Sequence, residues 1–99
     1  MKGEHSNLTT IYIPSNHFES RAKERLHIEI TPELNQEITL RVQNGLYRGR
    51  KRSKKTAGVY IYELYTGGNL RNLLNNSCGD TIEVVIDTTN GQLVTIYQN

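Results

Sequence analysis

The residues of this sequence best suited to chemistry are six cations within eight consecutive positions. They are Arg48, Arg50, Lys51, Arg52, Lys54 and Lys55. They make up half of the twelve lysines and arginines of the 99-residue chain, whose net charge is only +2. No acidic residue lies between Glu37 and Glu63, so the sequence supplies no local neutralising charge. Because such a density of like charge destabilises a fold unless an anion is nearby, the segment predicts a polyanionic ligand.

The residue types in the segment GLYRGRKRSKKTAG suit a nucleic acid. Arginine pairs bidentately with guanine edges in the major groove, whereas lysine supplies positive charge to phosphates. We therefore expect Arg50 or Arg52 to read a base, and Lys54 and Lys55 to hold the backbone. A localisation tract or a solvated loop are the other interpretations of such a run.

The sequence offers few residues that could carry a reaction or hold a metal. His5, His17 and His27 are 12 and 10 positions apart, so none forms the close pair typical of a zinc site. Cys78 is the only cysteine and has no evident base beside it, which indicates a structural thiol and excludes an intramolecular disulfide. Asp80 lies in a Gly-Asp turn, where it is expected to cap the backbone. We expect no catalytic residues, no metal, no cofactor and no enzymatic activity.

The composition predicts one globular domain over residues 1–99. Hydrophobic residues make up 35% of the chain, which is enough to build a small core. A membrane span needs about 18 consecutive apolar residues, and no run approaches this length. The stretch MKGEHSNLTT lacks the apolar segment of a secretory signal. The sequence therefore predicts a soluble cytoplasmic protein without a membrane partner.

Short alternating apolar runs predict a mostly β fold. The expected strands cover residues 9–13, 26–30, 38–42, 59–64, 81–86 and 92–97, with a third strand allowed between the first short helix and the basic segment, which is expected to be a loop that runs to Gly58. Short helices are expected over residues 15–20 and 69–75. The turn TPELNQ is expected to join two strands as a hairpin, and Asn90-Gly91 to join the last two. So many short strands can hide their edges only in a sandwich or a closed or nearly closed barrel, whose ends the helices could plug.

Two stretches resemble the DNA-binding pseudobarrel domains, a family that includes plant B-three-type domains and the specificity domains of EcoRII-type restriction endonucleases. IYIPSNHFES resembles the family's strand ending in Ile-Pro followed by a short helix. VYIYELYTGGNLRNLLNNSCGDTIEVVI is similar to its strand, glycine turn, short helix and Gly-Asp turn. The order of elements agrees from about Leu8 to Tyr97. The resemblance implies a seven-stranded open β-barrel with two short helices that grips the DNA major groove with two arms.

The resemblance also assigns the two arms to particular residues. The carboxyl-terminal arm corresponds to the six cations listed above. The amino-terminal arm corresponds to Asn7, Thr9, Thr10 and Tyr12, of which Tyr12 matches the family most closely. The tryptophan common in the plant helix is absent around Leu70, and the basic segment lacks the acids of some endonuclease members. The base sequence recognised by the family is therefore not carried over.

Charge and resemblance together predict a sequence-specific double-stranded DNA-binding module without its own catalysis. It would act as a monomer, or as the recognition domain of a restriction endonuclease joined to a nuclease domain. One alternative is a single-stranded nucleic-acid or RNA-binding barrel, in which Tyr47, Tyr60, Tyr62 and Tyr65 stack on bases. Tyrosines in an alternating strand also commonly cover a core. Another alternative is a dimeric swapped-hairpin regulator or an inhibitor that docks on an acidic protein.

Overall fold

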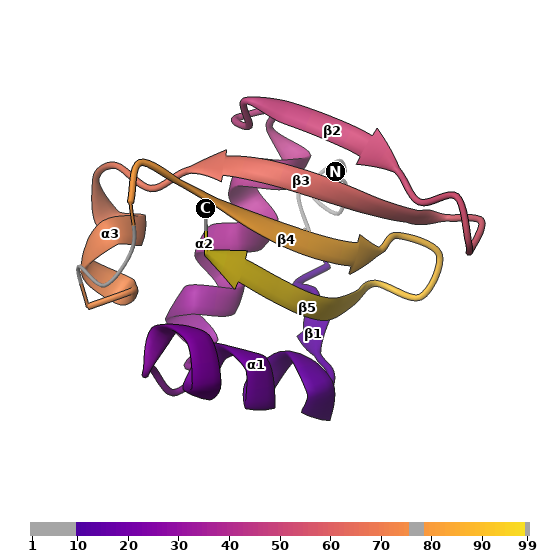
Figure 1. The fold of residues 1–99 in the computed structure, drawn as a ribbon. Coiled ribbons are helices and arrows are strands. Elements are labelled where there is room, and N and C mark those ends of the chain that lie inside the picture. The colour runs from indigo at the N-terminus through magenta and orange to yellow at the C-terminus, as the bar shows by residue number, and fades with distance from the viewer. Residues whose placement is uncertain (1–9, 76–78, 99) are drawn as a thin grey trace, which may run out of the picture.

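The structure is a computed structural model that describes residues 10–75 and 79–98, which form one mixed sheet flanked by helices (Figure 1). In chain order the elements are β1 (Ile13–Pro14), α1 (Asn16–Leu26), α2 (Pro32–Gln43), β2 (Gly49–Arg52), β3 (Val59–Tyr65), α3 (Asn69–Leu73), β4 (Thr81–Asp87) and β5 (Gln92–Gln98). The strand order is β1-β5-β4-β3-β2, with β1 parallel to β5 and the other pairs antiparallel. The helices α1 and α2 pack on one face of the sheet, and we call the other face the open face. The strand β2 forms one edge.

The expected seven-stranded barrel is wrong: the described chain is a small α/β domain with a five-stranded sheet and three helices. The main error concerns the predicted hairpin at residues 26–30 and 38–42, most of which lies in helices. Thr31 caps α2, because its hydroxyl accepts a hydrogen bond from the Leu34 amide at 3.2 Å. Leu34, Ile38 and Val42 are buried and four residues apart, which places them on one side of a helix.

The helix α1 is longer than the short helix expected at residues 15–20. Ser15 caps it as expected, since its hydroxyl accepts a hydrogen bond from the Phe18 amide at 3.0 Å. The helix then continues through the charged residues 21–25, which were expected to form a link. Phe18, Ala22 and Leu26 recur every fourth residue and are buried, so the charged residues between them occupy the outer side of the helix.

Other predicted elements are confirmed. The strands expected at residues 59–64, 81–86 and 92–97 correspond to β3, β4 and β5, and the helix expected at residues 69–75 is α3. The turn between β4 and β5 is fixed by Asp87. Hydrogen bonds from Asn90 and, more weakly, Thr89 hold the pKa of the Asp87 carboxyl below its ordinary value. Of the strand expected at residues 9–13, only Ile13 lies in β1, and residue 9 is outside the described residues.

Alternation along the strands builds the core on the helix side of the sheet. Leu64, Val84 and Ile96 are fully buried, and they face the buried stripes of α1 and α2. Their neighbours in the sequence point to the open face, as expected for a strand with a period of two. The core thereby fixes which residues of β3, and of the strand β2 paired with it, point toward each face.

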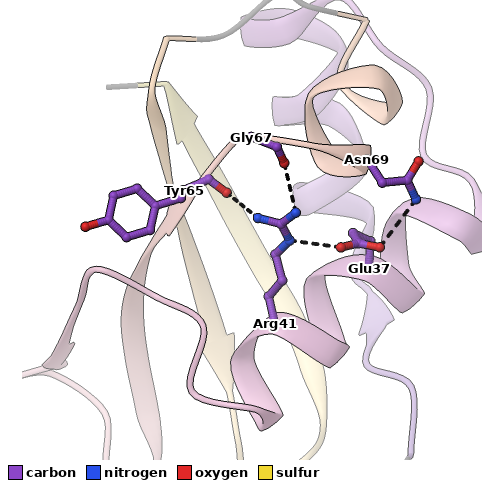
Figure 2. Close-up of polar contacts among 5 residues, drawn as sticks. All are labelled: Glu37, Arg41, Tyr65, Gly67 and Asn69. Atoms are coloured by element: carbon purple, nitrogen blue, oxygen red, sulfur yellow. Dashed lines mark hydrogen bonds and ion pairs between the residues drawn. The ribbon is translucent and has the colours of Figure 1, made fainter.

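Arg41 joins α2 to the turn after β3 (Figure 2). Its Nη1 donates to the Tyr65 carbonyl at 2.7 Å and its Nη2 donates to the Gly67 carbonyl at 2.9 Å. Its Nε pairs with Glu37 at 2.9 Å, and the other oxygen of Glu37 accepts from Asn69 at 3.4 Å. A single guanidinium therefore holds the end of β3 and the start of α3 against α2.

We expect Arg41→Lys to lower the free energy of unfolding by about 1–2 kcal/mol, because one ammonium group cannot reach all three acceptors. Denaturant unfolding measures this loss. The matched control is Arg21→Lys, whose side chain pairs with Glu24 on the helix surface and should change stability by less than about 0.5 kcal/mol. Equal effects of the two substitutions would contradict the role given to Arg41.

The turn between β2 and β3 is anchored to the turn between β4 and β5. The Gly58 carbonyl accepts hydrogen bonds from the Thr88 amide at 2.9 Å and from the Thr88 hydroxyl at 2.7 Å. Gly58 has a φ of +83°, a conformation that side chains disfavour, and a Cβ there would clash with the Thr89 hydroxyl. These contacts therefore fix the position of Gly58, where the basic segment ends.

Gly58→Ala should destabilise the protein by about 1–3 kcal/mol from backbone strain, with a further loss from the clash at Thr89. Gly45→Ala is the matched control, because Gly45 also has a positive φ of 73° but nothing within 4 Å of its Cβ position. Thermal unfolding of both variants should show the larger loss for Gly58→Ala. A larger loss for Gly45→Ala would show that the contact between the two turns does not matter.

Candidate nucleic-acid interface

All six clustered cations lie along the free edge of the sheet, on β2 and the residues that flank it. We call this set, Arg48, Arg50, Lys51, Arg52, Lys54 and Lys55, the basic edge. All six residues are exposed. The segment was expected to be a loop that runs up to Gly58, but residues 49–52 form a strand paired to β3. Pairing holds these backbone positions in an extended geometry.

The pairing register divides the cations of β2 between the two faces of the sheet. Arg50 lies opposite Tyr62, which is 4% exposed and part of the core, so Arg50 is on the helix side. Arg52 lies opposite Tyr60 on the same side. Lys51 lies opposite Ile61 and points to the open face. The edge therefore presents positive charge on both sides of one strand.

Most of this charge is not neutralised within the described part of the chain. Arg48 lies 3.7 Å from Glu63, and that carboxylate also accepts a hydrogen bond from the Thr81 hydroxyl at 3.3 Å. For the other five cations, no ion pair is recorded within residues 10–75 and 79–98. The basic edge thus has the unpaired charge that an anionic ligand requires.

The open face beside the basic edge is acidic. A cleft of about 370 Å³ is lined by Lys51, Ile61, Glu63 and Glu83, together with Gly49 and Arg50. Glu63 and Glu83 lie directly opposite each other on β3 and β4. Since two carboxylates repel phosphate, a polyanion is directed to the outer edge of the sheet and away from its open face.

On the helix side, a cluster of tyrosines surrounds Arg50. The rings of Tyr47 and Tyr62 meet edge to face with centres 5.1 Å apart, and those of Tyr60 and Tyr62 are tilted with centres 6.3 Å apart. The guanidinium carbon of Arg50 lies 5.0 Å from the centre of the Tyr60 ring, within the range of a cation–π interaction. We call Tyr47, Tyr60 and Tyr62 the tyrosine cluster.

The ionisation of these groups reflects their contact. A hydrogen bond with Tyr62, with a smaller effect of the nearby Tyr47, raises the pKa of Arg50 above its ordinary value. Burial raises the pKa of Tyr62, while the hydrogen bond and charge of Arg50 act in the opposite direction. Tyr62 therefore favours the charged form of Arg50. Arg50 in turn favours the ionised form of Tyr62, but burial outweighs this effect and favours the neutral ring.

The structure places the residues of the expected amino-terminal arm in different settings. Asn7 and Thr9 lie outside the described residues. Thr10 is exposed, and its carbonyl accepts a hydrogen bond from Gln43 at 3.4 Å. The Tyr12 amide donates to the Thr39 hydroxyl at 3.0 Å, and the Tyr12 ring packs against the core. Tyr12 also lies close enough to Tyr62 to contribute to the raised pKa of Tyr62.

The sequence suggested Tyr47, Tyr60 and Tyr62 only as base-stacking residues of the single-strand alternative or as cover for the core, and their contact with Arg50 was missed. Tyr60 and Tyr62 share a face in the pattern VYIYELY, which the alternation of a strand indicates. Their link to Arg50 depends on the register of β2 against β3. That register could have been found only if residues 49–52 had been identified as a strand.

Within residues 10–75 and 79–98, no group of three or more His, Cys, Asp or Glu side chains is placed to hold a metal ion. His5 and Cys78 lie outside the described residues. In the described part of the chain, no helix combines the length and apolar character needed to cross a membrane.

Comparison of the chain with protein-family models, curated proteins and solved structures found no match. We therefore base the function on the charge and geometry of the basic edge and the groups around it.

We expect the pKa of Tyr62 to rise further in Arg50→Gln, because the substitution removes a hydrogen bond and a charge that favour the ionised ring. Tyrosine ring signals followed by NMR across the alkaline range would show this shift. In the wild-type protein the raised pKa also means that the unfolded chain loses its proton first, so stability falls as the pH rises above about 10. Arg52→Gln is the control and should leave the pKa of Tyr62 unchanged.

Proposed function

We propose that this domain binds double-stranded DNA in a sequence-specific manner through its basic edge and acts as a binding module without catalysis of its own. The observation that carries the proposal is the alternation of cations on one edge strand. A strand that carries long side chains on both sides is roughly 10 Å thick, which is about the distance between two packed sheets. The major groove of B-form DNA is about 12 Å wide, so the edge can enter it with each face toward one phosphate backbone.

This mode of binding uses the charges on both faces at once. In it, Arg50 and Arg52 lie on one side of the inserted strand and Lys51 lies on the other. A single strand lying along one face would leave the cations of the other face unused. Duplex RNA is disfavoured because its A-form major groove is deep and narrow.

The proposal replaces the two-armed grip of a pseudobarrel. The sheet is not that barrel, and the ring of Tyr12 is half-buried against the core, so it offers little surface to a ligand. Thr10 is exposed and remains available for a second contact. A longer parent protein, in which this domain guides a nuclease, is compatible with binding through one edge.

A second candidate ligand is single-stranded RNA or DNA on the open face. It is favoured by two exposed aromatic side chains on that face, Tyr65 (53% exposed) and Tyr97 (40% exposed), which could stack on bases. Glu63 and Glu83 lie on the same face and disfavour the backbone of such a strand. Tyr97 is also covered on one side by Arg25, whose guanidinium lies 4.3 Å from the ring centre.

Binding to a random-sequence duplex should fall steeply with salt. Six neutralised phosphates give a log–log slope on the order of −5, since each contributes about −0.9. The double substitution Lys54→Ala with Lys55→Ala should weaken binding to all sequences alike and reduce the magnitude of the slope by about 2. Fluorescence anisotropy at a series of salt concentrations measures both quantities.

Lys23→Ala serves as the control, because Lys23 is exposed on α1 away from the basic edge. It should leave both affinity and slope nearly unchanged. Single-stranded DNA and duplex RNA should compete poorly with duplex DNA. Stronger competition by a single strand, together with weaker binding of Tyr65→Ala, would favour the open-face candidate and contradict the proposal.

A further inference from the structure

One cation of the basic edge is held in place differently from the others. Arg50 stacks on the Tyr60 ring and lies opposite Tyr62 in the sheet, close enough for Tyr62 to raise the pKa of Arg50. Within the described residues, the structure records no side-chain partner for Lys51, Arg52, Lys54 or Lys55. Arg48 is paired with an acid. Arg50 is thus restrained by aromatic side chains while its positive charge stays unpaired.

The groups that restrain Arg50 are themselves fixed. Tyr62 is 4% exposed and lies within β3, between the neighbouring strands β2 and β4. Its ring packs edge to face on Tyr47. Tyr60 is half-buried on the same side of β3 and packs against the core. The Arg50 side chain therefore lies on a rigid support.

This restraint leaves Arg50 available for a ligand. Arg50 as a whole remains exposed. A guanidinium has five N–H donors, and the contacts with Tyr60 and Tyr62 occupy one face and one part of its rim. The remaining donors can form a bidentate contact. Because the side chain is already ordered, it loses less conformational freedom on binding than a free arginine does.

Reading a base and holding a phosphate make different demands on a side chain. A bidentate contact to a base edge requires two donors in a fixed plane and direction, whereas a phosphate accepts charge from many directions. Arg50 meets the first demand, and the cations without side-chain partners meet the second.

We propose that Arg50 is the base-reading residue of the basic edge, with the O6/N7 edge of a guanine as its target, and that Tyr60 and Tyr62 are positioning residues. The inference rests on the proposed binding of duplex DNA. It assigns the specificity to one residue, whereas the sequence left Arg50 and Arg52 equivalent. The recognised site must then contain a G·C pair at the position that Arg50 meets.

Selection from a random-sequence duplex library tests the assignment on the full chain. The variants are Arg50→Lys, which keeps the charge but loses the planar fork, and Tyr62→Phe, which removes only the hydroxyl. The control is Arg52→Lys. We expect the wild-type protein to enrich guanine at one position, Arg50→Lys to lower that preference by roughly 5- to 150-fold, and Arg52→Lys to retain it.

Tyr62→Phe should reduce the same preference by a smaller factor, while its affinity for a random duplex stays within about twofold because no charge is lost. An NMR signal of the Arg50 guanidinium provides a readout without DNA: it should broaden or shift in Tyr62→Phe as the restraint is lost. Because Arg50 is exposed, Arg50→Lys is expected to fold even if Tyr62→Phe is destabilised.

The outcomes separate the inference from the function on which it rests. An unchanged base preference in Arg50→Lys, or an equal loss in Arg52→Lys, overturns the assignment while the binding of duplex DNA stands. Binding of the wild-type protein to the library without an enriched motif overturns the assignment together with the sequence specificity of the proposed function, while binding of duplex DNA stands. Failure of the wild-type protein to bind any duplex overturns both.

Discussion

The pairing of β2 with β3 is the interaction on which the candidate site depends. It arranges a run of mutually repelling cations as an extended strand, with Arg50 opposite Tyr62 and Lys51 opposite Ile61. An unpaired segment of the same sequence would have no fixed face. Because β3 also contributes Tyr62 and Leu64 to the core, the position of the charges follows directly from the packing of the domain. The edge is thus rigid where it carries charge.

The charge on this edge also has a purely structural consequence. An exposed edge strand can pair with another chain, and charged residues prevent this association. Three cations within β2 are enough for such protection, whereas the basic edge extends over six and continues into the turn that Gly58 anchors. An arginine supported by tyrosines, as Arg50 is, is also more than repulsion requires. An anionic ligand would explain these additional cations and the support of Arg50.

The sequence predicted the parts of the fold in which one periodicity dominates. The strands β3, β4 and β5 alternate clearly, and each lies close to its expected position. The segment that became α2 satisfied two patterns, since Ile38, Leu40 and Val42 alternate while Leu34, Ile38 and Val42 recur every fourth residue. The Thr31 cap and Pro32 favoured the helix, as did the absence of a glycine in the expected turn. The sheet of the final structure is smaller because the expected strand at residues 38–42 is helical and residues 27–30 of the other form neither a strand nor a helix.

The sequence predicted the cations of the candidate site, but it did not predict the contact of Arg50 with the tyrosine cluster. The six cations are contiguous, so composition alone identified them. Tyr60 and Tyr62 lie on β3, and only the register between β2 and β3 places them beside Arg50. Tyr12 was expected to contact DNA as part of the amino-terminal arm, whereas its side chain packs against the core. Local patterns predict such a segment well but contain little information about contacts between distant residues.

The most direct test is NMR mapping of the isotopically labelled domain titrated with a short B-form DNA duplex. Binding in the major groove predicts backbone shifts along residues 48–55, on both faces of β2, together with side-chain shifts at Arg50 and Tyr62. The NMR signals of residues on the outer side of α1 should not shift. Shifts centred on Tyr65 and Tyr97 of the open face, or no shifts at low salt, would contradict the proposal that the basic edge binds duplex DNA.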